Sequence, residues 1–287
     1  MKYLEIDSSS ATRIGLAHGP ALRGFQERHP DLIEYVEIPF EQLRHDARTA
    51  AIQESLPTIL HCASMSVAGF VPPDEATLVA IAHEAARMRT PWIGEHLAFV
   101  SADPLGHDER PGSKPTALTY TVCPQLSEEV ISRVADNLSN LQARFTVPLL
   151  IENPPQYFAV PGSTMDMVDF IGEVFARCPV DVGLLLDLTH FYITSVNMDF
   201  DAAAAIRRLP LERVVEIHIS GLTVQSGVAW DDHASAAPDA VLDLLDHVLE
   251  RVRPRAITFE YNWSTSVPDA LVVRQIARVR EMLATQQ

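Results

Sequence analysis

The sequence contains no continuous apolar run of about 18 residues, so it predicts no helix that crosses a membrane. Its first residues, MKYLEIDSSS, include acidic side chains and do not show the basic-then-apolar pattern of a secretory signal. Cysteine is scarce, and Cys62, Cys123 and Cys178 are odd in number and far apart, which favours reduced thiols over a disulfide framework. We therefore expect a cytoplasmic protein.

Basic residues are also few, because 22 Lys plus Arg stand against 38 Asp plus Glu and leave a formal net charge of −16. Nucleic-acid binding depends largely on Lys and Arg, so this balance argues against a nucleic-acid partner. Two phosphate-binding patterns are missing as well: the segment HGPALRG after the first expected strand is not GxGxxG, and GxxxxGK[ST] occurs nowhere. The acidic excess is compatible with an internal cation site, although most acidic residues of any protein are simply solvated.

Short apolar, β-branched runs alternate with longer amphipathic stretches along all 287 residues. Near-continuous apolar runs are typical of strands covered on both faces. The expected strands are Arg13–Leu16, Glu34–Ile38, Thr58–Ala63, Trp92–Leu97, Val147–Glu152, Val182–Asp187, Val214–Ile219 and Ala256–Glu260.

Helices are expected between these strands, and several begin at a good cap or a first-turn proline. They are Phe40–Glu54, Asp74–Arg89, Ser127–Arg144, Thr164–Arg177, Asp199–Leu209, Pro238–Arg253 and Pro268–Thr285. Eight strands alternating with helices predict an α/β fold of the (β/α)8 TIM-barrel type, whose usual size is ~250 residues. We expect one domain over residues 1–287. The alternative for alternating strands and helices is a doubly wound open sheet, but that fold would usually carry a glycine-rich phosphate loop, and neither pattern named above is present.

One polar segment, residues 100–124, holds four prolines and separates the fourth strand from the next helix. A loop of this length in a compact domain is usually a lid or a binding loop, or else a disordered insertion. In a barrel it lies on the C-terminal face of the strands, where active sites are built. We therefore expect a long loop over that face.

Six consecutive strands deliver an ionisable side chain where the strand stops. One such residue is more often an ordinary hydrogen-bonding group than a ligand, but a barrel brings all its strand ends to one axis. Several carboxylates meeting there without a cation would repel one another and lose hydration. The expected metal ligands are His61, His96, Glu152, Asp187, His190, His218, Asp231, His233 and Glu260. Oxygen and imidazole donors suit Zn²⁺, Mn²⁺ or Fe²⁺. The absence of aligned cysteine thiolates argues against a structural zinc site and against an iron–sulfur cluster.

Alternation along each strand decides which side chains point inward. Glu95 and His96 face opposite ways, as do His61 and Cys62, so only one of each pair faces the metal. We place the two histidines there and leave Glu95 and Cys62 outside the ligand set.

The same rule applies to the last strands and the loop between them. Glu216 and His218 share a face, which leaves both open as ligands. Asp231 and His233, two residues apart, can approach one ion together, and Asp232 then points away.

Asp187 and His190 are three residues apart at a strand-to-loop exit and could serve two neighbouring ions.

A metal-bound histidine usually donates its other ring N–H to a nearby acceptor. Candidates for such supporting positions are Glu37, Glu95, Asn153, Glu216 and Asn262.

The ligand pattern resembles that of xylose-isomerase-like barrels, among them the trinuclear-zinc endonucleases of apurinic sites. It resembles more closely the DUF692 family, the multinuclear non-heme iron-dependent oxidases that include methanobactin and thiaglutamate biosynthesis enzymes. The similarity covers nearly the whole chain, and together its segments are highly specific. In family order they are YVEI, ILHCASMSVAG, GEHLAF, LLIENPPQYF, LLLDLTHFYITSVN, EIHISG, WDDHASAAPDAV and ITFEYN.

The resemblance implies a barrel that holds two or three irons. His61, His96 and Glu152 would hold one ion, and Glu152 would bridge to a second. Asp187, His218 and Glu260 would complete that second site. His190, Asp231 and His233 would hold a third. The irons would bind O₂ and abstract hydrogen from a residue, commonly cysteine, of a ribosomally made precursor peptide. Many relatives work with a small partner protein that presents the leader of the precursor.

Four positions depart from the family pattern. Leu222 stands where many members have a second histidine, and LDLTH replaces LDVNN and restores a ligand at His190. Asn262 replaces an acidic residue, and Cys62 replaces a common glycine. The departures favour a trinuclear site and leave the modified residue open.

Two other functions fit the residues. A zinc- or manganese-dependent hydrolase or isomerase could use a metal-activated water on a phosphate or sugar substrate. A metal-stabilised scaffold that binds peptide without chemistry is the non-enzymatic alternative. The identity of the bound metal separates the first of these from an iron oxidase.

Overall fold

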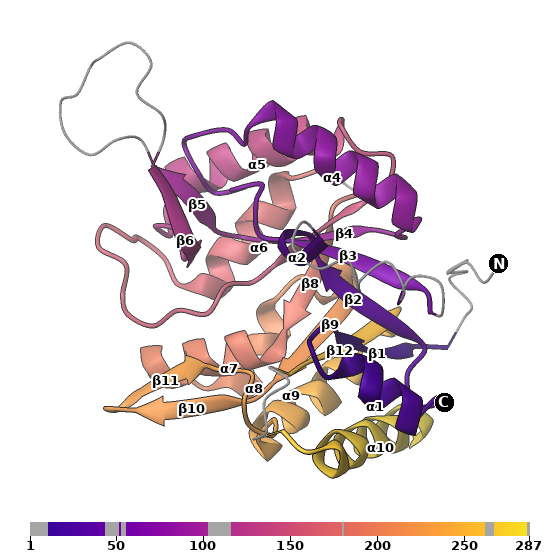
Figure 1. The fold of residues 1–287 in the computed structure, drawn as a ribbon. Helices are drawn as coiled ribbons and strands as arrows, with labels where there is room; N and C mark the ends of the chain where they lie inside the picture. The colour runs from indigo at the N-terminus through magenta and orange to yellow at the C-terminus, as the bar shows by residue number, and fades with distance from the viewer. Residues whose placement is uncertain are drawn as a thin grey trace.

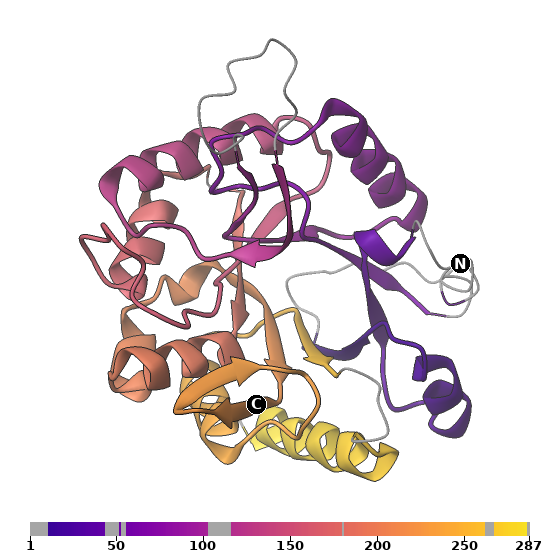
Figure 2. The same ribbon diagram turned by 60° about the vertical axis from the view of Figure 1, so that its left-hand side comes forward.

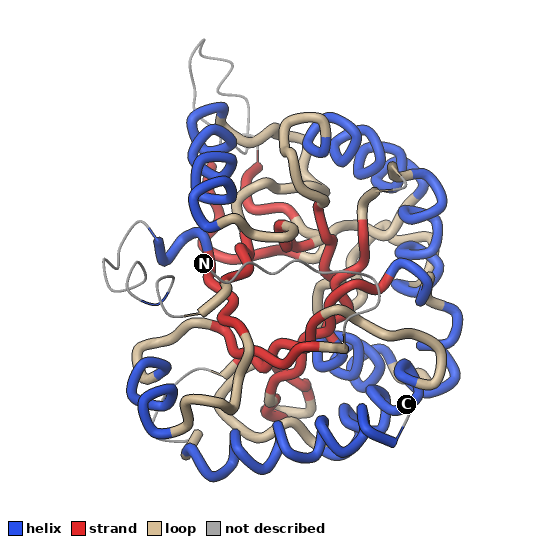
Figure 3. Tube along the Cα trace, turned by 90° about the vertical axis from the view of Figure 1, so that its right-hand side faces the viewer, coloured by secondary structure: helices blue, strands red, loops and turns tan. Residues whose placement is uncertain are grey.

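Eight parallel strands close into a barrel that helices surround (Figure 3). The computed structural model describes residues 11–43, 52, 56–102, 116–179, 181–261 and 267–285. Around the barrel the strand order is β1-β12-β9-β8-β7-β4-β3-β2. The barrel strands are β1 (Arg13–Ala17), β2 (Tyr35–Pro39), β3 (Thr58–Cys62), β4 (Ile93–His96), β7 (Leu149–Glu152), β8 (Gly183–Asp187), β9 (Val214–Ser220) and β12 (Ala256–Glu260). The predicted (β/α)8 barrel and all eight of its expected strands are confirmed.

The barrel interior is layered, because inward-facing side chains recur every second residue along each strand. An apolar layer near the strand starts contains Tyr35, Ile59, Trp92, Leu150, Leu185 and Ala256. Two residues further along β3, β7 and β8 stand His61, Glu152 and Asp187. The apolar layer therefore forms a floor beneath a polar layer at the C-terminal ends of the strands.

The longer helices pack their apolar faces on the outside of the barrel. The helices are α1 (Leu22–Arg28), α2 (Phe40–Leu43), α4 (Glu75–Met88), α5 (Glu128–Gln142), α6 (Met167–Arg177), α7 (Leu188–Met198), α8 (Ala202–Ala205), α9 (Asp239–Leu249) and α10 (Asp269–Thr285), with short 3₁₀ turns at Ile206–Arg208 and Leu211–Arg213. Asp74 caps α4 as expected, whereas α6 begins later than predicted, with Asp166 as its cap instead of Thr164. No helix of the described ranges is long and apolar enough to span a membrane.

The helix after β8 differs from the prediction. Asp199–Leu209 was expected to be helical, but α7 starts directly at Leu188, and only α8 and a 3₁₀ turn follow within the predicted range. The segment LTHFYITSV is buried on several sides against β9, β11 and α9, so it shows no amphipathic period. Asp187, expected at a strand-to-loop exit, is the N-cap of this helix.

Two antiparallel hairpins extend from the same side of the barrel (Figure 1). β5 (Phe99–Ala102) pairs with β6 (Thr116–Val122), and β10 (Leu222–Gln225) pairs with β11 (Val228–Asp231). The first hairpin replaces part of the predicted long loop at residues 100–124, of which residues 103–115 lie outside the described residues. Of the predicted helix Phe40–Glu54, only α2 and Ile52 are described, and residues 44–51 and 53–54 also lie outside the described residues.

The floor of the barrel makes a stability prediction. A Cβ at Gly15 would lie 2.4 Å from the ring of Tyr35, which is fully buried and hydrogen-bonded to Thr258. Gly15→Ala should therefore lower the free energy of unfolding by about 1–3 kcal/mol, measured by urea titration. Gly172→Ala is the control, because a Cβ on that helical glycine meets no atom within 4 Å and should be neutral or stabilising. Equal stability of both variants would contradict the close approach at Gly15.

Candidate metal centre

The polar layer at the strand ends gathers all nine predicted ligands into three groups whose donor atoms lie within 4.8 Å of one another. The groups are His61, His96 and Glu152; Glu152, Asp187, His218 and Glu260; and His190, Asp231 and His233. These side chains come from β3, β4, β7, β8, β9 and β12 at or near their ends, from β11 and the segment after it, and from the first turn of α7. The structure thus brings together residues up to two hundred positions apart, as the convergence of strand ends requires.

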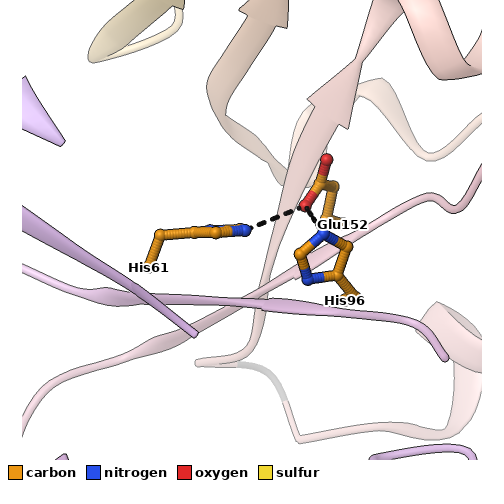
Figure 4. Close-up of side chains that lie close together, drawn as sticks. All are labelled: His61, His96 and Glu152. Carbon is orange, nitrogen blue, oxygen red and sulfur yellow. Dashed lines mark ion pairs between the residues drawn. The ribbon is translucent and has the colours of Figure 1, made fainter. Parts of the chain in front are cut away.

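Glu152 lies at the centre of the first group (Figure 4). Its Oε2 is 3.2 Å from Nε2 of His61 and 3.2 Å from Nε2 of His96, and both rings point at the same oxygen. Nδ1 of His96 faces the carbonyl oxygen of Cys62 at 3.2 Å. Cys62 itself is buried among the apolar side chains of the core, so it stays outside the ligand set.

The second group uses the other oxygen of the same carboxylate. Oε1 of Glu152 lies 3.7 Å from Nδ1 of His218, and that nitrogen is 3.3 Å from Oε2 of Glu260. Asp187 completes the group from the end of β8. A carboxylate with one oxygen in each of two groups has the arrangement of a bridging ligand between two cations.

The third group stands nearer to solvent, at the mouth. Oδ2 of Asp231 lies 2.7 Å from Nε2 of His233 and 3.3 Å from Nε2 of His190. The other oxygen of Asp231 accepts a hydrogen bond from the hydroxyl of Ser220. Asp187 connects this group to the second, since its Oδ1 accepts the backbone N–H of His190 at 2.6 Å.

A fourth group lies beneath the cluster and holds His218 from behind. Nε2 of His218 faces Oε2 of Glu37 at 3.1 Å and Oε1 of Glu216 at 3.7 Å. Glu216 in turn accepts hydrogen bonds from Nε1 of Trp92 and from the hydroxyl of Thr258. Sequence reasoning missed Trp92 and Thr258; the period of two could have found Thr258, which precedes Glu260 by two residues on the same face.

The remaining supporting candidates have different roles. Asn153 binds Asp187 through two hydrogen bonds to its backbone, and its own carbonyl faces Nδ1 of His190 at 3.0 Å. Glu95 has no ion pair with an imidazole of the described residues; it accepts the backbone N–H groups of Met65 and His96. Asp232 accepts the backbone N–H of Ala234 and, as expected, is in none of the clusters that the described residues form. Asn262 lies outside the described residues.

Buried polar atoms without a hydrogen-bond partner test whether cations fit. Among the described side chains eight such atoms occur, and five belong to residues of this cluster. One of the five, Nδ1 of His61, lies beside Gly94. The other four lie among the clustered donor atoms: Oε1 and Oε2 of Glu152, Oδ2 of Asp187 and Nδ1 of His218. Burying unpaired polar groups is costly, so native proteins rarely leave several together. A positive ion among these atoms would satisfy all of them, and their types are those that bind Zn²⁺, Mn²⁺ and Fe²⁺. The residues present therefore fit a metal cluster.

Without a metal ion, protons on the imidazoles compensate the negative charges of the buried carboxylates. Burial opposes ionisation of Glu152, but the surrounding imidazoles, His96 foremost, hold its pKa well below the usual range. Burial also disfavours charged imidazoles, yet Glu37 and Glu152 raise the pKa of His61 to about 10. The pKa of His96 is lowered because burial dominates there. Burial raises the pKa of Glu95 to about 8, which suits a side chain that serves the backbone instead of a cation.

A cavity of about 590 Å³ opens above the cluster. His61, His96, His190, Asp231, His233 and Glu260 line its base. Tyr120 and Cys123 border it from β6 and the residue beyond, and Tyr157, stacked on Trp230 with ring centroids 4.6 Å apart, borders it from the loop after β7. Figure 2 shows both hairpins beside the barrel opening. The cluster is therefore reached from this face.

A closed barrel with imidazoles and carboxylates gathered at the C-terminal ends of its strands defines a TIM-barrel protein with clusters that could hold metal ions. The model of one family, RiPP precursor modification enzyme MbnB/TglH/ChrH, matches residues 13–284. The chain belongs to this family, whose members are enzymes that act on precursor peptides.

Two relatives are described only as UPF0276 proteins. RB0508 of Rhizobium meliloti is 30% identical over 242 residues, which cover 83% of this chain and 74% of the relative. A protein of Streptomyces avermitilis is 28% identical over 284 residues, which cover 94% of this chain and 54% of that protein. The chain thus spans about half the length of the Streptomyces relative.

Solved structures with the same fold are more distant. A 3-keto-D-glucoside 4-epimerase from E. coli aligns with a TM-score of 0.57 and 15% identity over 96% of this chain and 99% of its own. Endonuclease IV from Thermus thermophilus aligns with a TM-score of 0.54 and 18% identity over 94% and 99%. These similarities concern the fold alone and agree with the closed (β/α)8 barrel.

Gly94 gives a geometric prediction for this site. A Cβ on Gly94 would lie 2.4 Å from Nδ1 of His61, so Gly94→Ala must displace that ring from Glu152. We expect the variant to retain fewer metal ions per chain after dialysis, measured by elemental analysis. Gly172→Ala, the same substitution on an outer helix, should keep the wild-type content. Full metal content in Gly94→Ala would show that His61 does not hold an ion in this position.

Metal binding should also release protons. Carboxylates raise the pKa of His233 to about 9 and hold those of His190 and His218 well above the usual range, against the effect of burial. The raised pKa values favour protonated imidazoles, which must lose the proton to coordinate, so metal affinity should fall as the pH falls. Calorimetric titration with Zn²⁺ in two buffers of different ionisation enthalpy should give different heats at pH 7. Equal heats would contradict the expectation.

Proposed function

We propose that this protein is a multinuclear iron-dependent oxidase that uses O₂ to modify a residue, commonly cysteine, of a ribosomally synthesised precursor peptide. The observation that supports it best is the shared carboxylate of Glu152, with one oxygen among His61 and His96 and the other facing His218. Membership of a family that modifies precursor peptides supports the substrate class. We expect the reaction to take place in the cytoplasm.

The donor set supports two or three ions of intermediate softness. Five imidazoles and six carboxylates take part in the four groups, and no thiolate does among the described residues. Six carboxylates match the charge of three divalent cations, and imidazole with carboxylate is a usual ligand set for non-heme iron. We assign His61, His96 and Glu152 to one ion, Glu152, Asp187, His218 and Glu260 to a second, and His190, Asp231 and His233 to a third.

Each protein group has a distinct task in this proposal. Bound iron would supply the binding of O₂ and the removal of hydrogen from the substrate residue. Glu37 and Glu216 hold Nε2 of His218, so that its Nδ1 faces the centre. The carbonyl of Asn153 holds Nδ1 of His190 and leaves Nε2 for the mouth. The apolar floor keeps water away from the lower side of the cluster.

The precursor would enter through the cavity above the cluster, where His233 of the third group is 30% exposed. A small partner protein that binds the leader of the precursor would present it. Since the chain covers 54% of the Streptomyces relative, the activity, substrate and partner of the complete protein belong to the proposal.

Metal analysis tests the proposal directly. Protein purified without oxygen should contain two to three irons per chain, give the Mössbauer spectrum of a coupled iron cluster, and consume O₂ when a precursor peptide is present. Stoichiometric zinc without iron, together with activity on a phosphodiester or sugar, would instead support the hydrolase or isomerase alternative.

A pair of variants separates the enzyme from a peptide-binding scaffold. Glu152→Gln removes the charge shared by two groups and should abolish O₂ consumption and lower the iron content by at least one ion per chain. His83→Ala changes a histidine that is exposed on α4 and should leave both quantities unchanged. If Glu152→Gln loses iron but the modified peptide still accumulates in cells, the scaffold alternative is correct.

A further inference from the structure

A second cavity, of about 570 Å³, adjoins the one above the cluster, and its lining is apolar. Among the described residues that line it, no side chain carries a charge, in a protein whose net charge is −16. Phe70, Phe99, Tyr120, Val122 and Phe158 form much of the wall. We call this the aromatic cavity.

Exposed hydrophobic side chains are concentrated at this place. Of the seven large hydrophobic residues that are most exposed in the described chain, three border the aromatic cavity: Phe70 at 70%, Tyr120 at 69% and Phe158 at 64%. Contiguous exposed apolar surface of this kind usually marks a binding site. Isolated exposed residues elsewhere are common on protein surfaces.

The walls are held by specific contacts, so the cavity is already formed. The guanidinium of Arg133 lies 3.3 Å above the ring of Phe70, a cation–π contact. Asn137 donates to the carbonyls of Val67 and Gly69 and so holds the turn that precedes Phe70.

Opposite, the loop that follows β7 is tied to the segment before α5. Gln125 donates to the carbonyl of Pro161, and the backbone N–H of Leu126 donates to Ser163. A cavity with walls held in this way requires little ordering when a ligand binds.

The aromatic cavity lies next to the cavity above the cluster, because the two share lining residues. Tyr120 and Cys123 line both cavities. The pairing of β5 and β6 shifts between Phe99 and Ser101, and such bulges re-aim side chains near binding sites. Any extended chain that reaches the cluster past Tyr120 therefore lies beside the apolar wall.

We propose that the aromatic cavity binds a large apolar side chain of the precursor peptide, close in sequence to the residue that the metal centre modifies. The proposal rests on the proposed function, because it takes the peptide to enter the mouth above the cluster. Consecutive side chains of an extended peptide point to opposite sides. One can therefore reach the cluster while a neighbour enters the aromatic cavity.

Binding to zinc-loaded protein tests this without any oxidation. The probes are blocked synthetic hexapeptides of glycine and serine with one central cysteine, carrying phenylalanine or alanine immediately before or after it. We expect one phenylalanine peptide to bind about tenfold or more tightly than its alanine counterpart, measured by calorimetry. Equal affinities, or no measurable binding of any probe, would overturn the proposal.

A matched pair of substitutions locates the preference. Phe158→Asp places a carboxylate in the apolar wall and should remove the preference for phenylalanine, as should Tyr120→Ala. Val79→Asp changes a comparably exposed residue of α4 that lines neither cavity and should preserve it. Both mutated wall residues are largely exposed, so the variants should fold, which circular dichroism checks. A preference that survives Phe158→Asp and Tyr120→Ala would place the apolar site elsewhere and overturn the proposal.

Two further measurements complete the test. The first distinguishes a peptide site from a dimer interface, and the second separates failure of the proposed oxidase from failure of the peptide site. Sedimentation of the wild type and Phe158→Asp shows whether a second copy covers the cavity; a dimer that Phe158→Asp dissociates would overturn the proposal. Iron content and O₂ consumption are measured on separate samples. A protein that lacks iron but retains the phenylalanine preference would refute the proposed oxidase and leave the peptide site standing.

Discussion

The burial of Glu152 among imidazoles is the constraint on which the rest of the site depends. Its carboxylate is only 1% exposed, and its two oxygens face four different histidines at 3.2–3.7 Å. An isolated carboxylate in such surroundings would be strongly destabilised, so positive charge must accompany it. Protons on the imidazoles supply that charge in the protein alone, and cations would supply it in the working enzyme. Binding of cations at this site would therefore be linked to folding through Glu152.

Much of the barrel is predictable from the sequence, because strands buried on both faces appear as apolar runs between helices. All eight barrel strands lie where the pattern predicts them. Helix α7 was missed for the same physical reason: its burial on several sides removes the amphipathic period that identifies a surface helix. The hairpin β5–β6 was expected to be a loop, because its strands are short and flank a polar, proline-rich segment.

The site residues show a similar division. Residues at strand ends are predictable because a barrel brings those ends to one axis and alternation selects the inward members, which separates His96 from Glu95. The contacts that orient these site residues are harder to predict from the sequence. Trp92 holds Glu216 across the barrel floor from a position 124 residues away, and no local pattern indicates that pairing. Asn153 acts on His190 through its backbone carbonyl, so its side-chain type does not reveal the role.

Asp187 caps helix α7 and is also a candidate metal ligand, and the first role restricts the second. One oxygen is committed to the backbone N–H at the start of α7, and only the other remains without a hydrogen-bond partner. An ion beside it would therefore gain one oxygen from this aspartate, where a chelating carboxylate would give two. Asp231 is similar, since Ser220 occupies one of its oxygens. With one oxygen each, these two aspartates would leave more of an ion's coordination to the neighbouring imidazoles, or to an incoming molecule, than chelating carboxylates would.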